Sequence, residues 1–273
     1  MNINSNHEYI RSKDNERVKL FSKLSLPKYR ESEKLFLAEG VKLCREALDA
    51  GLAEYLLVSE ERYEETGVSE IVTGEAGDVQ VLVLSAVAFS KVTTESSPQG
   101  IIAVCRFPDF HVIGEDANAS DFSGKRIIAL DGIRDPGNLG TIFRSALAFG
   151  VDAVILGDCA DLYSSKTVRA SMGALFRLHA AVCGDLSIFL SKLKGDGRRI
   201  IGAALSENSL TLGEYEKRSD DVVVIGNEGH GLSAEVLGVC DCIVKIPMAE
   251  FSESLNAGVA ASVIMWEYWK NNR

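Results

Sequence analysis

Two polar side chains at the start of one helix are the first residues of this sequence that could do chemistry. They are Asn138 and Arg144, in the stretch 131–145, "DGIRDPGNLGTIFRS". An apolar run ends here, a Pro-Gly pair makes a turn, and a helix is predicted over 138–149 with Asn138 suited to its N-cap. Arg144 lies off the apolar stripe of that helix. Its guanidinium suits either a surface ion pair or a bidentate contact with a carboxylate or phosphate.

The glycines of this stretch do not form either of the common phosphate cradles. A dinucleotide fingerprint needs G-x-G-x-x-G, whereas only Gly137 and Gly140 are present. No Gly-Lys-Ser/Thr follows, as a P-loop would need. These absences disfavour a nucleotide-dependent α/β enzyme of another kind. The groups of this stretch that could do chemistry are therefore the amide of Asn138 and the guanidinium of Arg144.

A second polar stretch, 225–233 "IGNEGHGLS", has three glycines and one carboxylate, that of Glu228. Such a density of glycine either lets the backbone approach a ligand closely or makes a plain tight turn, and the sequence leaves both open. Glu228 would repel a phosphate, so a ligand that carries positive charge fits this loop better.

A third stretch, 246–256 "IPMAEFSESLN", leads into a long apolar helix predicted over 254–270. Ser252 does not complete a capping box, because leucine stands three residues later where Glu or Gln is needed. Ser254 is the other candidate N-cap of this helix.

The three stretches need strands to bring them together, and the second half of the sequence supplies them. Its strand candidates are continuous apolar runs, as expected for parallel strands that are covered on both faces. Each of the three polar stretches follows one of these runs, at the edge where open α/β sheets bind their ligands. The predicted strands are 126–131, 153–156, 178–182, 199–205, 222–226 and 242–247, and the further helices are 164–172, 186–194 and 233–238.

The first third also alternates between strands and helices, which predicts a smaller α/β unit of its own. The stretch 107–124 has no clear periodicity and is rich in Asp, Gly and Asn, so we predict a linker there. The predicted domains are therefore 1–106 and 125–273. Within the first domain we expect strands at 34–40, 53–59, 79–85 and 100–105, and helices at 14–24, 41–50, 67–77 and 85–91.

The composition is typical of a soluble globular protein, with 46% hydrophobic and 25% charged residues among 273. No apolar run reaches the roughly 18–20 residues of a membrane helix, and the polar N-terminus is unlike a secretory signal. Six cysteines are scattered without metal-ligand spacing. We therefore expect a cytoplasmic protein without a metal site, not bound to membranes, with reduced thiols.

The net charge of −10 argues against nucleic-acid binding by bulk positive charge. The charge is uneven, however, because residues 11–34 hold eight basic and four acidic side chains. A solvated helix face and a phosphate-binding patch both explain this local excess.

Taken together, the three polar stretches resemble the SpoU (TrmH-type) family of RNA 2′-O-ribose methyltransferases, which belongs to the SPOUT class. They resemble the family's three motifs in order and in spacing. The first third resembles the substrate-binding domain that often precedes the catalytic domain, through 28–48 "KYRESEKLFLAEGVKLCREAL" and 96–104 "SSPQGIIAV". The matching motif residues are Asn138-x-Gly140-x-x-x-Arg144, Gly226-Asn227-Glu228-x-x-Gly231-Leu232, Ile246-Pro247-Met248 and Ser254-Leu255-Asn256.

The resemblance implies a fold and partners that composition alone does not. It implies a C-terminal, mainly parallel α/β domain with a trefoil knot, and S-adenosylmethionine bound in that knot. It also implies a homodimer that packs partly through the final helix, and the stretch 259–269 "VAASVIMWEYW" is consistent with such an interface. The two-domain form resembles enzymes that act on ribosomal RNA more than those that act on transfer RNA.

The resemblance also assigns roles to individual residues. Arg144 is the expected central catalytic residue, and Glu228 is expected to help shape the pocket or the adjoining dimer contact. Asn138, Ser254 and Asn256 are expected to orient the nucleotide and Arg144. S-adenosylmethionine is expected at Gly226, Asn227, Gly231, Ile246, Met248 and Leu255, and RNA at Lys19, Lys23, Lys28 and Arg30.

Two departures from the family pattern keep a rival interpretation open. Glu250 stands where the family usually has glycine, and Ala257-Gly258 where it often has Val-Ser. The rival is a catalytically inactive RNA-binding or ribosome-assembly factor with the same fold. The motif residues are otherwise complete, which favours an active enzyme.

Overall fold

The computed structural model describes residues 7–113, 118–206, 209–249 and 254–270. The chain forms two compact units. The first comprises Met1–Pro108 with Tyr163–Phe176, and the second comprises Asp109–Leu162 with Arg177–Arg273.

The first unit is built on a five-stranded mixed sheet. The sheet has the order β1-β4-β3-β5-β2. Strands β1, β4 and β3 are parallel to each other, whereas β5 is antiparallel to both of its neighbours. The strands are β1 (Glu8–Ile10), β2 (Leu35–Glu39), β3 (Ala53–Ser59), β4 (Gln80–Leu84) and β5 (Ile101–Arg106).

Helices flank this sheet, and their apolar residues complete its core. Phe21 and Phe89 are buried in one cluster with strand residues such as Leu57 and Leu82. Asn15 caps the first helix by accepting a hydrogen bond from the backbone N–H of Arg17. The helices are α1 (Glu16–Lys23), α2 (Pro27–Glu33), α3 (Val41–Asp49), α4 (Thr66–Glu70), the π-helical turn η1 (Ile71–Glu75) and α5 (Ala86–Val92).

A segment from the second half of the sequence packs within the first unit. It holds α7 (Ser165–Ser171) and the turn η3 (Ala174–Phe176). The Tyr163 ring stacks on Phe107 at 3.8 Å between ring centres and lies 5.0 Å from Phe36. Phe176 lies 5.8 Å from the same Phe36 ring, and Arg169 forms an ion pair with Glu95. The segment therefore completes an aromatic core in the first unit.

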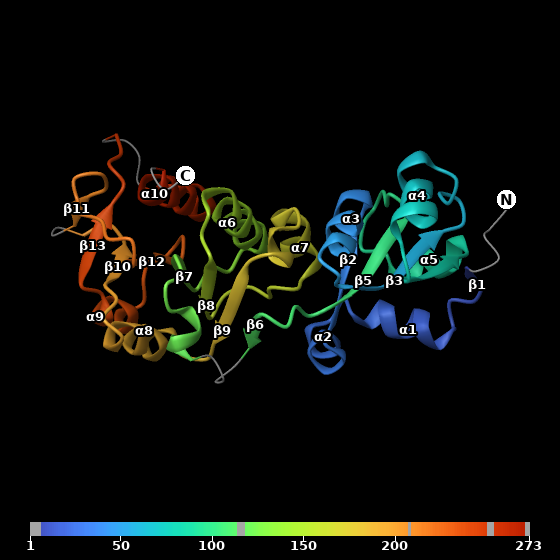
Figure 1. Cartoon of the computed structure of the whole chain (residues 1–273), viewed down its shortest axis with the longest axis horizontal. Helices are drawn as coiled ribbons and strands as arrows, with labels where there is room; N and C mark the ends of the chain where they lie inside the picture. Colours follow the sequence, from blue (N-terminus) through green and yellow to red (C-terminus); the bar gives the residue numbers. More distant parts are fainter. Residues whose placement is uncertain (1–6, 114–117, 207–208, 250–253, 271–273) are drawn as a thin grey trace. The chain divides into compact units, whose positions relative to one another are not determined.

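The second unit is built on an eight-stranded sheet in which every pairing is parallel (Figure 1). The predicted parallel α/β architecture is confirmed. The sheet has the order β11-β13-β10-β12-β7-β8-β9-β6. The strands are β6 (His111–Ile113), β7 (Ile127–Asp131), β8 (Ala153–Gly157), β9 (His179–Cys183), β10 (Ile200–Ala203), β11 (Leu210–Thr211), β12 (Val222–Gly226) and β13 (Cys242–Lys245).

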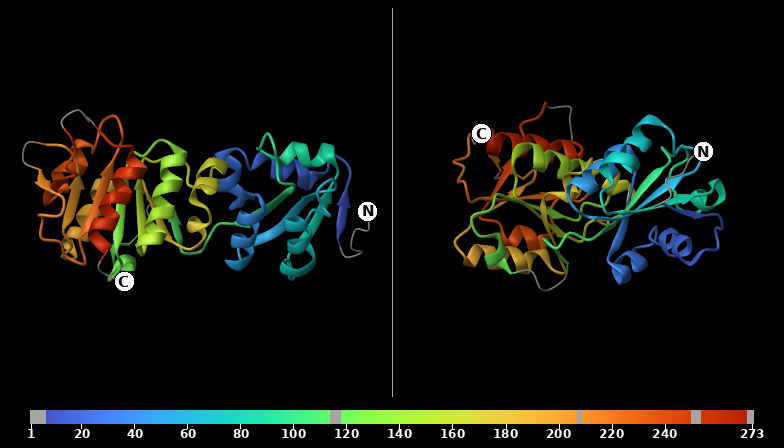
Figure 2. Two further views of the ribbon diagram at one scale, coloured as in Figure 1. Left: turned by 90° about the horizontal axis from the view of Figure 1, so that it is seen from above. Right: turned by 45° about the vertical axis from the view of Figure 1, so that its right-hand side comes forward.

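Helices cover both faces of this parallel sheet. On one face lie α6 (Pro136–Phe149) and α10 (Ala257–Trp269), side by side (Figures 1 and 2). On the other lie α8 (Leu186–Gly195), α9 (Ala234–Val239) and the short turn η2 (Ala119–Phe122). Because both faces are covered, the strand interiors are apolar throughout, which is why their runs are continuous in the sequence.

Several short elements were not predicted. They include β1, α2, β11 and the strand β6, which lies within the stretch 107–124 and pairs with β9. Two- and three-residue strands carry too little alternation to be seen in a sequence.

Candidate active site

The carboxyl edge of the parallel sheet brings two of the three polar stretches next to each other. Strands β7 and β12 are neighbours, and Asp131 is in register with Gly226 at their ends. The chain leaves β7 toward β8 on one side and later returns as β12 on the other. Such a reversal of strand order opens a crevice at the carboxyl ends, where doubly wound sheets bind ligands.

The helix after β7 begins earlier than predicted. It starts at Pro136, and its N-cap is Asp135, whose carboxylate accepts a 2.8 Å hydrogen bond from the backbone N–H of Asn138. The prediction that Asn138 is the cap was therefore wrong. Since Asp135 takes that role, the Asn138 side chain makes contacts with other segments.

Asn138 links three separate segments through its side-chain amide. Its oxygen accepts a 2.9 Å hydrogen bond from the side-chain nitrogen of Asn256. Its nitrogen donates to the carboxylate of Glu228. The structure thus joins one residue from each of the three predicted motifs.

Asn256 also begins the last helix. Its side-chain oxygen accepts a 3.2 Å hydrogen bond from the backbone N–H of Val259, so Asn256 is the N-cap of α10. The expectation that Ser254 caps this helix was wrong, and Ser254 is exposed. Ser252, the other candidate, and Glu250 lie outside the described residues.

The glycine-rich loop after β12 is organised by Asn227. Its backbone exchanges two 2.9 Å hydrogen bonds with the backbone of Gly231, which closes the loop. Its side-chain oxygen accepts from the N–H of Gly229, and its nitrogen donates to the carbonyl of Gly132 at 2.7 Å. Asn227 therefore shapes the loop and fastens it to the end of β7.

Gly226 and Gly231 have different roles in this loop. A Cβ atom at Gly226 would lie only 2.4 Å from the carbonyl carbon of Gly231, so the loop's own backbone requires glycine there. Gly231 has a φ of +71°. A Cβ at Gly231 would meet no atom of the described residues within 4 Å, so among them the backbone is open on that side.

Asp131 makes a contact with Ser233 that was not predicted from the sequence. One oxygen of its carboxylate accepts two hydrogen bonds from Ser233, from the backbone N–H at 2.7 Å and from the hydroxyl at 2.8 Å. The signal in the sequence was an acidic residue at the last position of a predicted buried strand.

Arg144 lies on the solvent-exposed side of α6, together with Thr141 and Leu147. Within the described ranges it makes no hydrogen bond and no ion pair. The neighbouring side of α6 runs along α10, where the hydroxyls of Ser145 and Ser262 lie 2.7 Å apart. The Arg144 side chain is exposed and therefore accessible to a ligand.

The remaining predicted site residues make no hydrogen bond with Asn138 or Glu228 that the described residues show. Ile246, Met248 and Leu255 are half-buried on the segments that flank the undescribed residues 250–253. Cys159, in the loop after β8, lies near the same edge. Burial raises the pKa of its thiol to about 12, so it is protonated near neutral pH and unsuited as a nucleophile. The described residues contain no cluster of three side chains that could hold a metal ion.

The proposed RNA patch on the first unit is smaller than predicted. Arg30 is only 4% exposed and donates a 2.6 Å hydrogen bond to the carbonyl of Leu24, so it holds the turn between α1 and α2. Lys28 is exposed. Lys23 lies over the ring of Tyr29, and Lys19 pairs with Glu16 at 3.0 Å.

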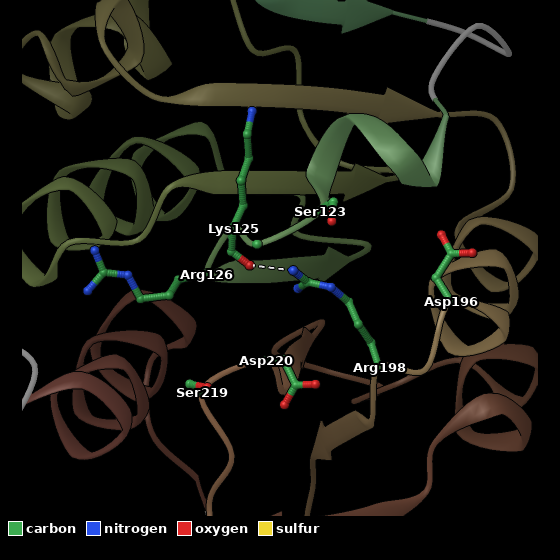
Figure 3. A pocket seen from close by; sticks show the side chains of 8 residues that line it. Ser123, Lys125, Arg126, Asp196, Arg198, Ser219 and Asp220 are labelled. Carbon is green, nitrogen blue, oxygen red and sulfur yellow. Dashed lines mark hydrogen bonds between the residues drawn. The ribbon is translucent and has the colours of Figure 1, made fainter.

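The opposite edge of the parallel sheet has a separate pocket of about 520 Å³ (Figure 3). Its Arg198 is only 8% exposed and donates to the carbonyls of Phe122 and Lys125, and burial lowers its pKa. Asp196 and Asp220 also line the pocket. None of the predicted site residues lies there, so this pocket is not the candidate active site.

Comparison with known proteins gives the class. A model described as the SpoU rRNA Methylase family matches residues 125–266, and one described as the MRM3-like substrate binding domain matches residues 15–103. The parallel α/β unit is therefore that of a methyltransferase, preceded by a domain of the substrate-binding type. More particularly, the chain belongs to the SpoU rRNA methylase family.

Relatives of known function and structure resemble the whole chain. The 23S rRNA (guanosine(2553)-2′-O)-methyltransferase RlmP of Bacillus subtilis is 35% identical over 260 residues, 94% of this chain and 97% of that protein. An AdoMet-bound rRNA methyltransferase from Sinorhizobium meliloti is 29% identical with a TM-score of 0.79, covering 97% and 98% of the two chains. A crystal structure of an RNA 2′-O ribose methyltransferase is 29% identical, also with a TM-score of 0.79, covering 97% and 99%.

Proposed function

We propose that this chain transfers the methyl group of S-adenosylmethionine to a ribose 2′-hydroxyl of ribosomal RNA. The reaction would take place at the crevice between the loops that follow β7 and β12. The observation that carries the proposal is the position of Asn138, hydrogen-bonded to both Glu228 and Asn256. It gathers polar groups from all three family motifs at one edge of the sheet. The relatives that act on ribosomal RNA support the choice of substrate.

The residues present fit S-adenosylmethionine. The loop after β12 is open beside Gly231, so its backbone can approach an adenosine group. Glu228 is exposed at the same loop, and a carboxylate there suits a ligand with a positively charged sulfur. Gly226, Asn227 and Gly231 would hold the cofactor together with Ile246, Met248 and Leu255. When bound, the cofactor supplies a methyl group that is already activated by its sulfonium.

The chain itself must then position the 2′-oxygen and stabilise the charge that develops on it. Holding two reacting groups in line can lower the barrier by several kcal/mol, on the order of 7–11 at best. An arginine stays protonated in proteins, so Arg144 is a poor base. Its fork suits a bidentate contact with the phosphate of the target nucleotide, and it can stabilise the developing alkoxide. The hydroxyl proton would leave through that phosphate or through a water molecule.

Asn138, Ser254 and Asn256 would orient the nucleotide and Arg144. Glu228 would keep the Asn138 amide in one orientation, because a carboxylate accepts hydrogen bonds and cannot donate them. The exposed lysines Lys23 and Lys28, with the half-buried Lys19, would supply part of the RNA contact on the first unit.

Further parts of the proposal concern assembly and location. Leu147, Val259, Val263 and Trp266 are 38–48% exposed on the paired helices α6 and α10. Such an apolar stripe suits a protein interface, and we propose that a homodimer forms through it. A trefoil knot in the C-terminal domain is part of the same proposal. No helix in the described ranges is long and apolar enough to cross a bilayer, and we propose a cytoplasmic location.

Calorimetry with S-adenosylmethionine, followed by methyl transfer to ribosomal RNA, tests the function. The RNA would come from cells that lack the gene, so that the target nucleotide is unmodified. We expect cofactor binding and a new 2′-O-methyl group at one position, mapped on the RNA. Cofactor binding without methyl transfer to any RNA would contradict the proposed activity. Binding of RNA without the cofactor, and no affinity for the cofactor, would favour the inactive assembly factor.

A further inference from the structure

The loop after β12 is fastened at both ends to two consecutive residues, Asp131 and Gly132, at the carboxyl end of β7. At its start, the side chain of Asn227 donates to the carbonyl of Gly132 at 2.7 Å. At its end, Ser233 donates its backbone N–H and its hydroxyl to Asp131 at 2.7 and 2.8 Å. Asp131 and Gly132 therefore tie both ends of the loop to the end of β7, in addition to the backbone bonds between Asn227 and Gly231 that close it.

Ser233 shows that the contact with Asp131 takes priority over an ordinary helix cap. Ser233 is the N-cap residue of α9, yet its side chain makes no hydrogen bond to the helix. Its hydroxyl is turned instead to the carboxylate of Asp131. A serine at this position would normally bond to a backbone N–H of the first turn. The acidic side chain on β7 has replaced that local bond with one between segments about a hundred residues apart.

Fixing the loop before a ligand arrives has a consequence for affinity. A loop that must be ordered on binding loses conformational entropy at that moment, whereas a loop already in its binding form does not. Hydrogen bonds to an ionised carboxylate are stronger than neutral ones, so Asp131 can hold its end of the loop firmly. Asp131 itself is half-buried beneath the loop, at the end of the strand.

We propose that Asp131 is a positioning residue for S-adenosylmethionine. It holds the loop 227–233 in the form that binds the cofactor, through its two hydrogen bonds with Ser233. The inference rests on the proposed function, in which this loop takes the cofactor. It assigns to Asp131 an effect on cofactor affinity and none on the chemical step.

The test compares Asp131→Ala, Asp131→Asn and Ser233→Ala with the wild type. We expect Asp131→Ala to raise the Kd for S-adenosylmethionine about tenfold, as the loss of one or two strong hydrogen bonds implies. The KM for the cofactor should rise in parallel, while kcat at saturating cofactor stays within about twofold. Ser233→Ala should have a smaller effect because its backbone N–H still reaches Asp131. Hydrogen exchange of residues 229–232 without cofactor should be faster in Asp131→Ala.

A matched control separates this role from a general loss of stability. Asp185 is likewise a carboxylate that accepts a backbone N–H, that of Ile188, but as the N-cap of α8 and away from the loop after β12. Asp185→Ala should lower the unfolding temperature while the Kd for the cofactor stays unchanged. Asp131→Asn keeps an acceptor oxygen for Ser233 but loses the charge, so its Kd should rise less than that of Asp131→Ala. If Asp131→Ala does not fold, this smaller rise carries the comparison.

Either of two results in the Asp131 variants would overturn the inference and leave the proposed function standing: an unchanged Kd for S-adenosylmethionine, or a loss of kcat with the KM unchanged. An equal loss of affinity in Asp185→Ala would also overturn it, because the effect would then follow stability. A wild-type chain without any affinity for S-adenosylmethionine would overturn the proposed function, and the inference with it.

Discussion

Asn256 donates a 2.9 Å hydrogen bond from its side-chain nitrogen to the side-chain oxygen of Asn138. The bond joins the first turns of α10 and α6, which then run side by side. Asn138 donates in turn to Glu228, which can only accept. The direction of both hydrogen bonds is therefore set, from Asn256 through Asn138 to the carboxylate. A change at either asparagine alters the orientation of the other.

The two roles of Asn256 can be separated by substitution. Asp is as good an N-cap as Asn, so Asn256→Asp should keep the bond from Val259 and change stability by no more than about 0.5 kcal/mol. It removes the N–H that Asn138 accepts, and we expect kcat for methyl transfer to fall about tenfold, the effect of one lost hydrogen bond. Asn256→Ala should lose about 1 kcal/mol of stability as well. Full activity in Asn256→Asp would show that the hydrogen bond from Asn256 to Asn138 is not needed for catalysis.

Arg144 offers a test of geometry against charge. Lysine keeps the positive charge but not the planar fork, so Arg144→Lys should lower kcat by about a hundredfold if a bidentate contact stabilises the transition state. The unfolding temperature should not change, because Arg144 is exposed. Arg218→Lys is the control, another exposed arginine of the second unit that should leave kcat unaltered. Unchanged turnover of Arg144→Lys with saturating RNA and cofactor would refute the assignment.

The lysines of the first unit can be tested through the salt dependence of RNA binding. Replacing Lys19, Lys23 and Lys28 by Ala should weaken RNA binding and reduce the slope of log K against log salt by up to about 2, since each phosphate contact contributes about 0.7. The ion pair of Lys19 with Glu16 is exposed and contributes little free energy, so Lys19 can leave it to contact a phosphate. Binding constants measured over a range of salt would decide. A slope equal to that of the wild type would exclude the patch.

Arg30 is the built-in contrast to these lysines. Arg30→Ala should leave the salt slope unchanged, because the side chain is buried. It removes the donor to the Leu24 carbonyl and should destabilise the protein by about 1–3 kcal/mol. Denaturant unfolding of both variants would distinguish a surface residue from a structural one.

The strands of the fold were the part most accessible from the sequence. The runs 53–59 and 222–226 match β3 and β12 at both ends. Parallel strands buried on both faces need apolar residues at every position, so their limits are visible as changes in polarity. The carboxyl edge, and with it the place of the site, follows from those strands and their order.

The caps could be predicted only in part. Asp135 and Asn138 both suit an N-cap, but proline favours the first position of a helix, so the Asp-Pro pair carried the correct signal. At the last helix, Ser254 and Asn256 are equally good caps, and only the contact with Asn138 favours one of them. The bond between Asp131 and Ser233 joins residues 102 apart in sequence. Nothing local in the sequence indicates such a pairing.

The sequence also did not predict which sheet the segment 163–176 packs on. Its helical period is clear, but the same apolar stripe would suit either sheet, and the partner that it packs on is decided by tertiary shape. Tyr163 contributes directly to this packing, because it is 4% exposed, stacks on Phe107 and lies beside Phe36.

Tyr163→Ala should therefore destabilise the first unit by about 3–5 kcal/mol, as loss of a buried aromatic ring does. Hydrogen exchange should become faster in β2 and β5, since Phe36 and Phe107 stand on and just after these strands. Tyr163→Phe keeps the stacked ring and should cost no more than about 1.5 kcal/mol, the worth of one hydrogen bond. Exchange that accelerates only in β8 and β9, with β2 and β5 unchanged, would show that the segment is held mainly by the second unit.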